Sequence, residues 1–179
     1  IEPTLSAMRE HGRPFTGLLY AGLMLTDEGP KVVEFNCRFG DPETEAILPL
    51  MRSSLLAPMV AVARGESLAG AAALQWEPLH AVTTVVAAAG YPEKPAIGGE
   101  IVLPPVSPDV TVFHAGTKLD GSGRLVSAGG RVLAVTALGD TLEIARARSA
   151  AAASAVRLER KQLRSDIGWR ELQRGARAT

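Results

Sequence analysis

Two apolar runs near the start of the chain flank a short polar turn. Residues 18–26 and 31–39 are each short enough to be a strand, and the residues between them, 27–30, are typical of turns. We therefore expect a β-hairpin. A helix is expected to end just before it, because Gly12 and Pro14 follow the stretch 5–10 and would stop a helix there.

The next segment contains residues that typically begin and interrupt helices. Asp41 followed by Pro42 is typical of a helix start, with Asp41 as the cap and acids in the first turn. Pro49 interrupts the helical pattern, which resumes over about residues 51–64.

The second half of the chain is richer in β-branched residues. Asp140 opens a capping-box pattern and predicts an Ala-rich helix to about residue 160. Glycine-rich turns at 120–123 and 129–130 predict hairpins between the later strands, and we place a domain boundary near Pro78. The strands expected in this half are 81–88, 100–103, 110–114, 124–127 and 131–136.

The amino-acid composition excludes several classes of protein. The 179 residues carry 19 basic and 19 acidic side chains, so no excess positive charge favours nucleic acid or an anionic membrane. A single cysteine excludes an internal disulfide scaffold, and no apolar run is long enough to span a membrane. We therefore expect a cytoplasmic protein with no nucleic-acid or membrane partner.

The most informative stretch is the second expected strand. Because side chains alternate between the faces of a strand, Glu34, Asn36 and Arg38 share one face. One interpretation is a solvated polar face. The other is a metal and phosphate site, since carboxylate and amide oxygens suit Mg²⁺ and a guanidinium neutralises phosphate. The opposite face is expected to be buried, and consists of Val33, Phe35, Cys37 and Phe39.

Residues 17–26 and 29–44, with the sequence EFNCRFGDPET at 34–44, closely resemble the phosphoribosylamine–glycine ligases, a family of ATP-grasp enzymes of purine biosynthesis. The similarity continues through 85–92, 112–117, 129–139 and 164–168. It implies an α+β chain: the C-terminal part of an ATP-grasp domain over residues 1–78, then a small antiparallel β-sheet domain with a flanking helix over 79–179.

The resemblance implies an ATP-dependent ligase that joins 5-phosphoribosylamine and glycine and releases ADP and phosphate. By the family's pattern, Glu34 and Asn36 bind Mg²⁺ or Mn²⁺, and Arg38 is the catalytic residue facing the reacting phosphate. Asp41 and Glu43 are candidate substrate-binding residues, with a helix cap and a first-turn acid as the alternative. Where the family has Gln, this chain has Glu45, which we expect to face solvent.

The chain begins with Ile1 and has no glycine-rich phosphate loop between a strand and a helix. We therefore expect an N-terminal part of the same enzyme to be missing, and the 179 residues to be inactive alone. Two alternatives stay open: another ATP-grasp carboxylate ligase, such as a biotin-carboxylase relative, and a non-catalytic module that only binds a partner.

Overall fold

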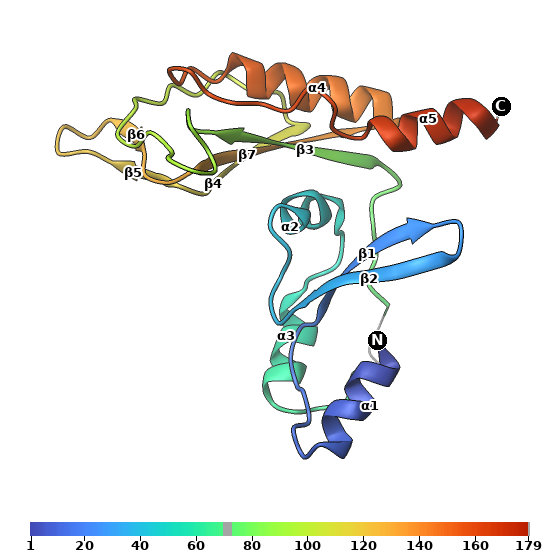
Figure 1. The fold of residues 1–179 in the computed structure, drawn as a ribbon. Helices are drawn as coiled ribbons and strands as arrows, with labels where there is room; N and C mark the ends of the chain where they lie inside the picture. Colours follow the sequence, from blue (N-terminus) through green and yellow to red (C-terminus); the bar gives the residue numbers. More distant parts are fainter. Residues whose placement is uncertain (70–72, 179) are drawn as a thin grey trace. The chain divides into compact units, whose positions relative to one another are not determined.

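In the computed structural model, which describes residues 1–69 and 73–178, the chain forms two compact units. The first contains Ile1–Asp41 and Arg52–Gln75, and the second contains Pro42–Met51 and Trp76–Thr179. Figure 1 labels the elements of both. No helix in the described ranges is long and apolar enough to cross a membrane.

The first unit consists of two helices and a hairpin: α1 (Glu2–Glu10), β1 (Tyr20–Thr26), β2 (Gly29–Asn36) and α3 (Leu56–Ala63). The predicted hairpin is confirmed, because β1 and β2 pair antiparallel from Tyr20↔Asn36 to Thr26↔Gly29. The second strand ends three residues earlier than we predicted. Gly12 and Gly65, both at φ +69°, follow α1 and α3, as expected of residues that end helices.

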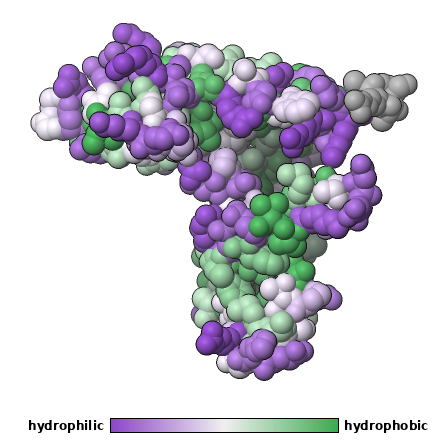
Figure 2. All heavy atoms as spheres, in the orientation of Figure 1, coloured by the Kyte–Doolittle hydropathy of each residue, from purple (hydrophilic) through white to green (hydrophobic). Residues whose placement is uncertain are grey.

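The prediction that one face of β2 is buried is wrong. Val33 is 66% exposed and Phe35 is 37% exposed, and both Cys37 and Phe39 are exposed as well. The hairpin is a separate two-stranded sheet, and neither α1 nor α3 packs extensively against it. Figure 2 shows apolar side chains at the surface of this unit. Alternation of side chains along the strand predicted which residues share a face. Whether that face is buried depends on another element that packs over it.

The second unit contains the remaining elements: α2 (Glu43–Ile47), a 3₁₀ turn (Leu48–Leu50), β3 (His80–Ala87), β4 (Val110–His114), β5 (Thr117–Leu119), β6 (Leu125–Ser127), β7 (Arg131–Gly139), α4 (Leu142–Ala155) and α5 (Trp169–Ala178). Strand β7 lies between β3 and β4 in an antiparallel sheet, and β5 pairs with β6 separately. Helix α4 packs against β3 and β7 (Figure 1). The α+β prediction of a small antiparallel sheet with a flanking helix is confirmed.

The core of the molecule lies between α4 and the three-stranded sheet. Val132, Leu133 and Val135 of β7 have no exposed surface, and Ala153 of α4 is equally buried. Burying such side chains stabilises the fold by about 1.5–3 kcal/mol for each Val or Leu.

Several local predictions in the second unit are wrong. Residues 100–103 form only isolated bridges, from Glu100 to Val126 and from Val102 to Arg157. Residues 129–130 do not close a hairpin, because β6 and β7 belong to different sheets. Helix α5 was not predicted.

The two predicted aspartate caps are also wrong. Helix α2 is capped by Pro42 without a side-chain hydrogen bond, so Asp41 lies one residue too early. Helix α4 is capped by Thr141, whose hydroxyl accepts a hydrogen bond from the Ile144 amide at 3.3 Å, in place of Asp140. In both cases a residue next to the predicted one occupies the cap position.

Candidate functional site

The predicted metal ligands lie at the end of strand β2. Glu34 pairs with Gly22 and Asn36 with Tyr20, two residues apart on each strand. A β-carbon built on Gly22 would lie 3.1 Å from Cγ of Glu34 and 3.7 Å from Cε1 of Tyr20, so these two side chains share the face onto which that carbon projects. Asn36, opposite Tyr20, continues this face because side chains alternate along a strand.

The two side chains differ in their surroundings. Glu34 is exposed, and its carboxylate makes no hydrogen bond or ion pair with any residue that the structure describes. Asn36 is partly buried, and its Nδ2 atom is inaccessible to solvent without a hydrogen-bond partner in the described part of the chain. An unsatisfied buried amide costs about 1–3 kcal/mol. A ligand with negatively charged oxygens would supply the missing acceptor.

Arg38 lies beyond the strand, in a bend, because β2 ends at Asn36. The expectation that it projects from the strand with Glu34 and Asn36 is therefore wrong. Its Nη1 donates a hydrogen bond to the backbone oxygen of Phe39 at 2.9 Å, which turns the guanidinium toward the chain that follows.

The two candidate substrate-binding residues fall on either side of a unit boundary. Asp41 is exposed and is the last residue of the first segment of the first unit. Glu43 begins α2 and lines a small pocket of about 290 Å³ in the second unit, together with residues of β3 and with Glu171.

Glu45 does not face solvent, so that interpretation is wrong. The residue is partly buried because α2 packs against β3 and β7, and its Oε2 has no solvent exposure and no hydrogen-bond partner among the described residues. Its backbone oxygen accepts a hydrogen bond from Oγ1 of Thr136 at 2.8 Å.

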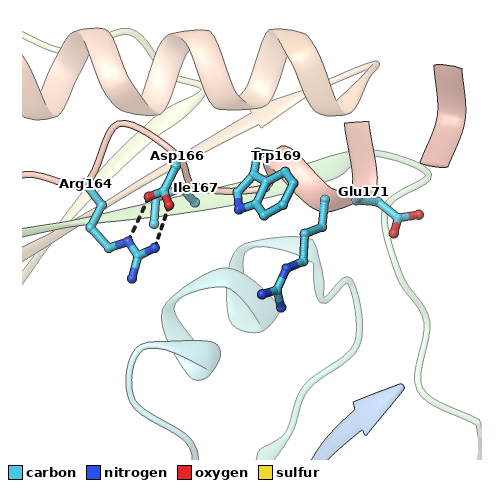
Figure 3. Close-up of a pocket in the computed structure, with 7 residues that line it drawn as sticks. Arg164, Asp166, Ile167, Trp169 and Glu171 are labelled. Atoms are coloured by element: carbon cyan, nitrogen blue, oxygen red, sulfur yellow. Dashed lines mark hydrogen bonds and ion pairs between the residues drawn. The ribbon is translucent and has the colours of Figure 1, made fainter. Parts of the chain in front are cut away.

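A second pocket lies where the chain enters α5, in a segment that contains none of the predicted site residues. Figure 3 shows Arg164 and Asp166 facing each other beside Trp169. Arg164 donates from Nε and Nη2 to the two oxygens of Asp166 at 2.8 and 2.6 Å, and this lowers the pKa of the Asp166 carboxyl. Arg146 holds the same segment by donating to the backbone oxygens of Ser165 and Ile167, each at 2.8 Å.

The donor set at the end of β2 suits a hard divalent cation only in part. Glu34 and Asn36 offer one carboxylate and one amide oxygen, and no cluster of three or more His, Cys, Asp or Glu side chains occurs in residues 1–69 and 73–178. Mg²⁺ is commonly held by one or two protein ligands, with water and phosphate oxygens completing its shell.

Two family models of known proteins match this chain. Residues 81–170 match the family model of the phosphoribosylglycinamide synthetase C domain, and residues 1–44 match that of the ATP-grasp (A) domain of the same synthetase.

Among individual proteins, the phosphoribosylamine–glycine ligase of Caulobacter vibrioides is 47% identical over 175 residues, which are 97% of this chain and 41% of that ligase. The ligase of Corynebacterium ammoniagenes is 46% identical over 93% of this chain and 39% of its own length. The crystal structure of the ligase from Thermotoga maritima matches 91% of this chain and 40% of its own, with a TM-score of 0.77 and 37% identity.

The chain thus spans about 40% of the length of the relatives it matches. Half of its residues fit the C-domain model, and the ATP-grasp match covers the hairpin that carries Glu34. The chain therefore belongs to the phosphoribosylglycinamide synthetase family.

Proposed function

We propose that this chain acts within an ATP-dependent ligase that joins 5-phosphoribosylamine to glycine, with release of ADP and phosphate. The observation that carries the proposal is the shared strand face of Glu34 and Asn36, in a hairpin covered by the ATP-grasp family match. The reaction is that of the phosphoribosylamine–glycine ligases to which this chain is similar, and the side chains of β2 offer it a chemical basis.

In this proposal, Glu34 and Asn36 hold Mg²⁺ or Mn²⁺ against the phosphates of ATP. The cation would neutralise charge that develops during phosphoryl transfer. The carboxylate of Glu34, which has no protein partner among the described residues, supports the metal assignment. The unsatisfied Nδ2 of Asn36 is a hydrogen-bond donor and supports a phosphate oxygen nearby, while the amide oxygen of Asn36 would be the metal ligand.

We assign Arg38 to the reacting phosphate. A guanidinium presents several hydrogen-bond donors in one plane, which suits phosphate oxygens. The hydrogen bond to the backbone of Phe39 orients the Arg38 side chain in the bend that follows β2.

Asp41 and Glu43 are proposed to contact the substrates, since both are exposed carboxylates in the segment that follows Arg38. We further propose that residues 1–78 belong to the ATP-grasp domain and residues 79–179 to the C-terminal domain. A cytoplasmic location is proposed from the composition, which includes a single cysteine.

The test compares two isosteric substitutions in a full-length ligase that carries these residues. Glu34→Gln removes the charged metal ligand, so we expect the turnover rate to fall at least about 100-fold. Glu45→Gln changes a carboxylate that has no assigned ligand role, so turnover should change far less. Formation of ADP that depends on glycine and 5-phosphoribosylamine is measured at saturating Mg²⁺. Equal losses in the two variants would contradict the role of Glu34.

A further inference from the structure

Gly22, directly opposite Glu34 in the hairpin, faces the side chain that is proposed to bind the metal. A β-carbon built on it would lie 3.1 Å from Cγ of Glu34 and 3.7 Å from the Glu34 backbone oxygen. The 3.1 Å distance is tighter than most real β-carbon contacts, whereas 3.7 Å is ordinary, so the stem of Glu34 would have to shift by a few tenths of an ångström to admit a side chain at position 22.

Backbone conformation does not explain the glycine at this position. Gly22 lies inside strand β1, and its φ is not among the positive glycine values of the chain. An L-residue could adopt this backbone. We therefore attribute the glycine to the room that its missing side chain leaves for the Glu34 stem. Glycine in a strand is common where another group approaches the backbone closely.

The register of the hairpin changes at the same place. Gly22 pairs with Glu34, but the next residue, Leu23, pairs with Val32, so Val33 is the extra residue of a β-bulge. A bulge redirects the neighbouring side chains of its strand. Glu34 is thus placed by two adjoining features, a bulge in its own strand and a residue without a side chain in the opposite strand.

The Glu34 side chain is exposed, and its contact with the opposite strand is made by its stem. Within the described ranges Glu34 forms neither a hydrogen bond nor an ion pair. Its stem lies across Gly22, and the ring of Tyr20 borders the same space, 3.7 Å from the position of the added carbon.

We infer that Gly22 is a positioning residue, which leaves room for the Glu34 stem and so fixes where the carboxylate meets the divalent cation. This rests on the proposed function, in which Glu34 is a metal ligand. Mg²⁺ demands near-ideal octahedral geometry, so a displacement of the carboxylate by a few tenths of an ångström weakens binding.

The first test is Gly22→Ala in a full-length ligase that carries this chain. We expect the Mg²⁺ concentration for half-maximal activity to rise about tenfold, with a smaller change in kcat at saturating Mg²⁺. The apparent dissociation constant of Mn²⁺ in the presence of ATP, measured by water-proton relaxation, should rise by a similar factor. Gly121→Ala is the matched control, because a β-carbon there meets no atom within 4 Å and the backbone φ is not positive.

A double-mutant cycle on Mn²⁺ binding separates the inference from the proposed function. If Gly22 acts through Glu34, Gly22→Ala should weaken binding no further in a Glu34→Gln background. Independent, multiplicative effects would overturn the inference, as would unchanged binding in Gly22→Ala. Unchanged binding and activity in Glu34→Gln would instead overturn the proposed function.

The inference also stays testable if Gly22→Ala fails to fold. In that case Glu34→Ala should restore the thermal unfolding transition of the Gly22→Ala variant, because it removes the Cγ atom that the new methyl group meets. A double variant that remains unfolded would show that Gly22 is needed for another reason, and the inference would be wrong.

Discussion

At the scale of single residues, the carboxylate of Asp120 organises the turn between β5 and β6. Oδ1 accepts hydrogen bonds from the amide and hydroxyl of Ser122 at 2.8 and 2.7 Å and from the amide of Arg124 at 3.0 Å, and Oδ2 accepts one from Nε of Arg124 at 3.0 Å. These donors favour the charged form, so the pKa of Asp120 is held far below its ordinary value, with the Ser122 side chain as the largest cause.

We expect the turn to loosen only in strong acid. Because the folded-state pKa of Asp120 is depressed, its stabilising effect is complete above the ordinary carboxyl pKa of about 4 and is lost as pH falls through the folded pKa. Carboxyl ¹³C shifts of Asp120 followed by NMR should therefore titrate well below those of a short peptide that contains the same residues. Titration of Asp120 together with the peptide would contradict the hydrogen-bonded turn.

Single residues also show how far the candidate site was predictable. Strand alternation alone placed Glu34 and Asn36 on one face, since it needs only local backbone geometry. The same rule failed for Arg38, because β2 ends two residues earlier. The separate expectation that Glu45 faces solvent failed because the environment of this helical residue depends on β3 and β7. The space over Gly22 was not predictable, because it arises from pairing across the hairpin.

At the scale of elements, helix α4 is joined to the sheet by a buried pair of hydroxyl groups. Oγ of Ser149 donates to the backbone oxygen of Val135 at 2.9 Å and lies 2.7 Å from Oγ1 of Thr84. Ser149 is fully buried and Thr84 is 3% exposed. Because the Ser149 proton is directed to Val135, the hydroxyl of Thr84 is the donor in the second bond.

Ser149→Ala should lower the free energy of unfolding by about 1–3 kcal/mol, since it leaves the Thr84 hydroxyl buried without an acceptor. Adding Thr84→Val removes that unsatisfied group and should recover part of the loss. Urea unfolding followed by circular dichroism measures both variants. A double variant less stable than the sum of the two single substitutions predicts would count against this hydroxyl pair.

Elements marked by local signals were predicted well. Glycine and proline residues, which end helices and form turns, located α1 and the hairpin. Strand β4 matches its expected range. Helix α5 is largely polar but amphipathic, and its short apolar periodicity went unrecognised, while β5 is only three residues long. The assignment of β6 and β7 to different sheets depends on contacts between distant residues, which turn residues do not reveal.

At the scale of the whole molecule, the two units differ in how much they bury. Every buried side chain of the core belongs to the second unit, between Val82 and Val156. In the described part of the first unit Gly40 alone is classed as buried. A two-stranded hairpin is marginally stable by itself, because it has little apolar surface to remove from water.

We therefore predict unequal protection of backbone amides in the 179-residue chain. In hydrogen exchange at neutral pH, amides of β3 and β7 should exchange slowest, through opening of the whole second unit, and amides of β1 and β2 should exchange much faster through local opening. Leu133→Ala, which should cost about 2–5 kcal/mol in the core, should accelerate exchange in β3 and β7 and leave the hairpin rates nearly unchanged. Equal protection of hairpin and sheet, independent of protein concentration, would mean that the hairpin is stabilised as strongly as the core, contrary to its exposed Val33 and Phe35.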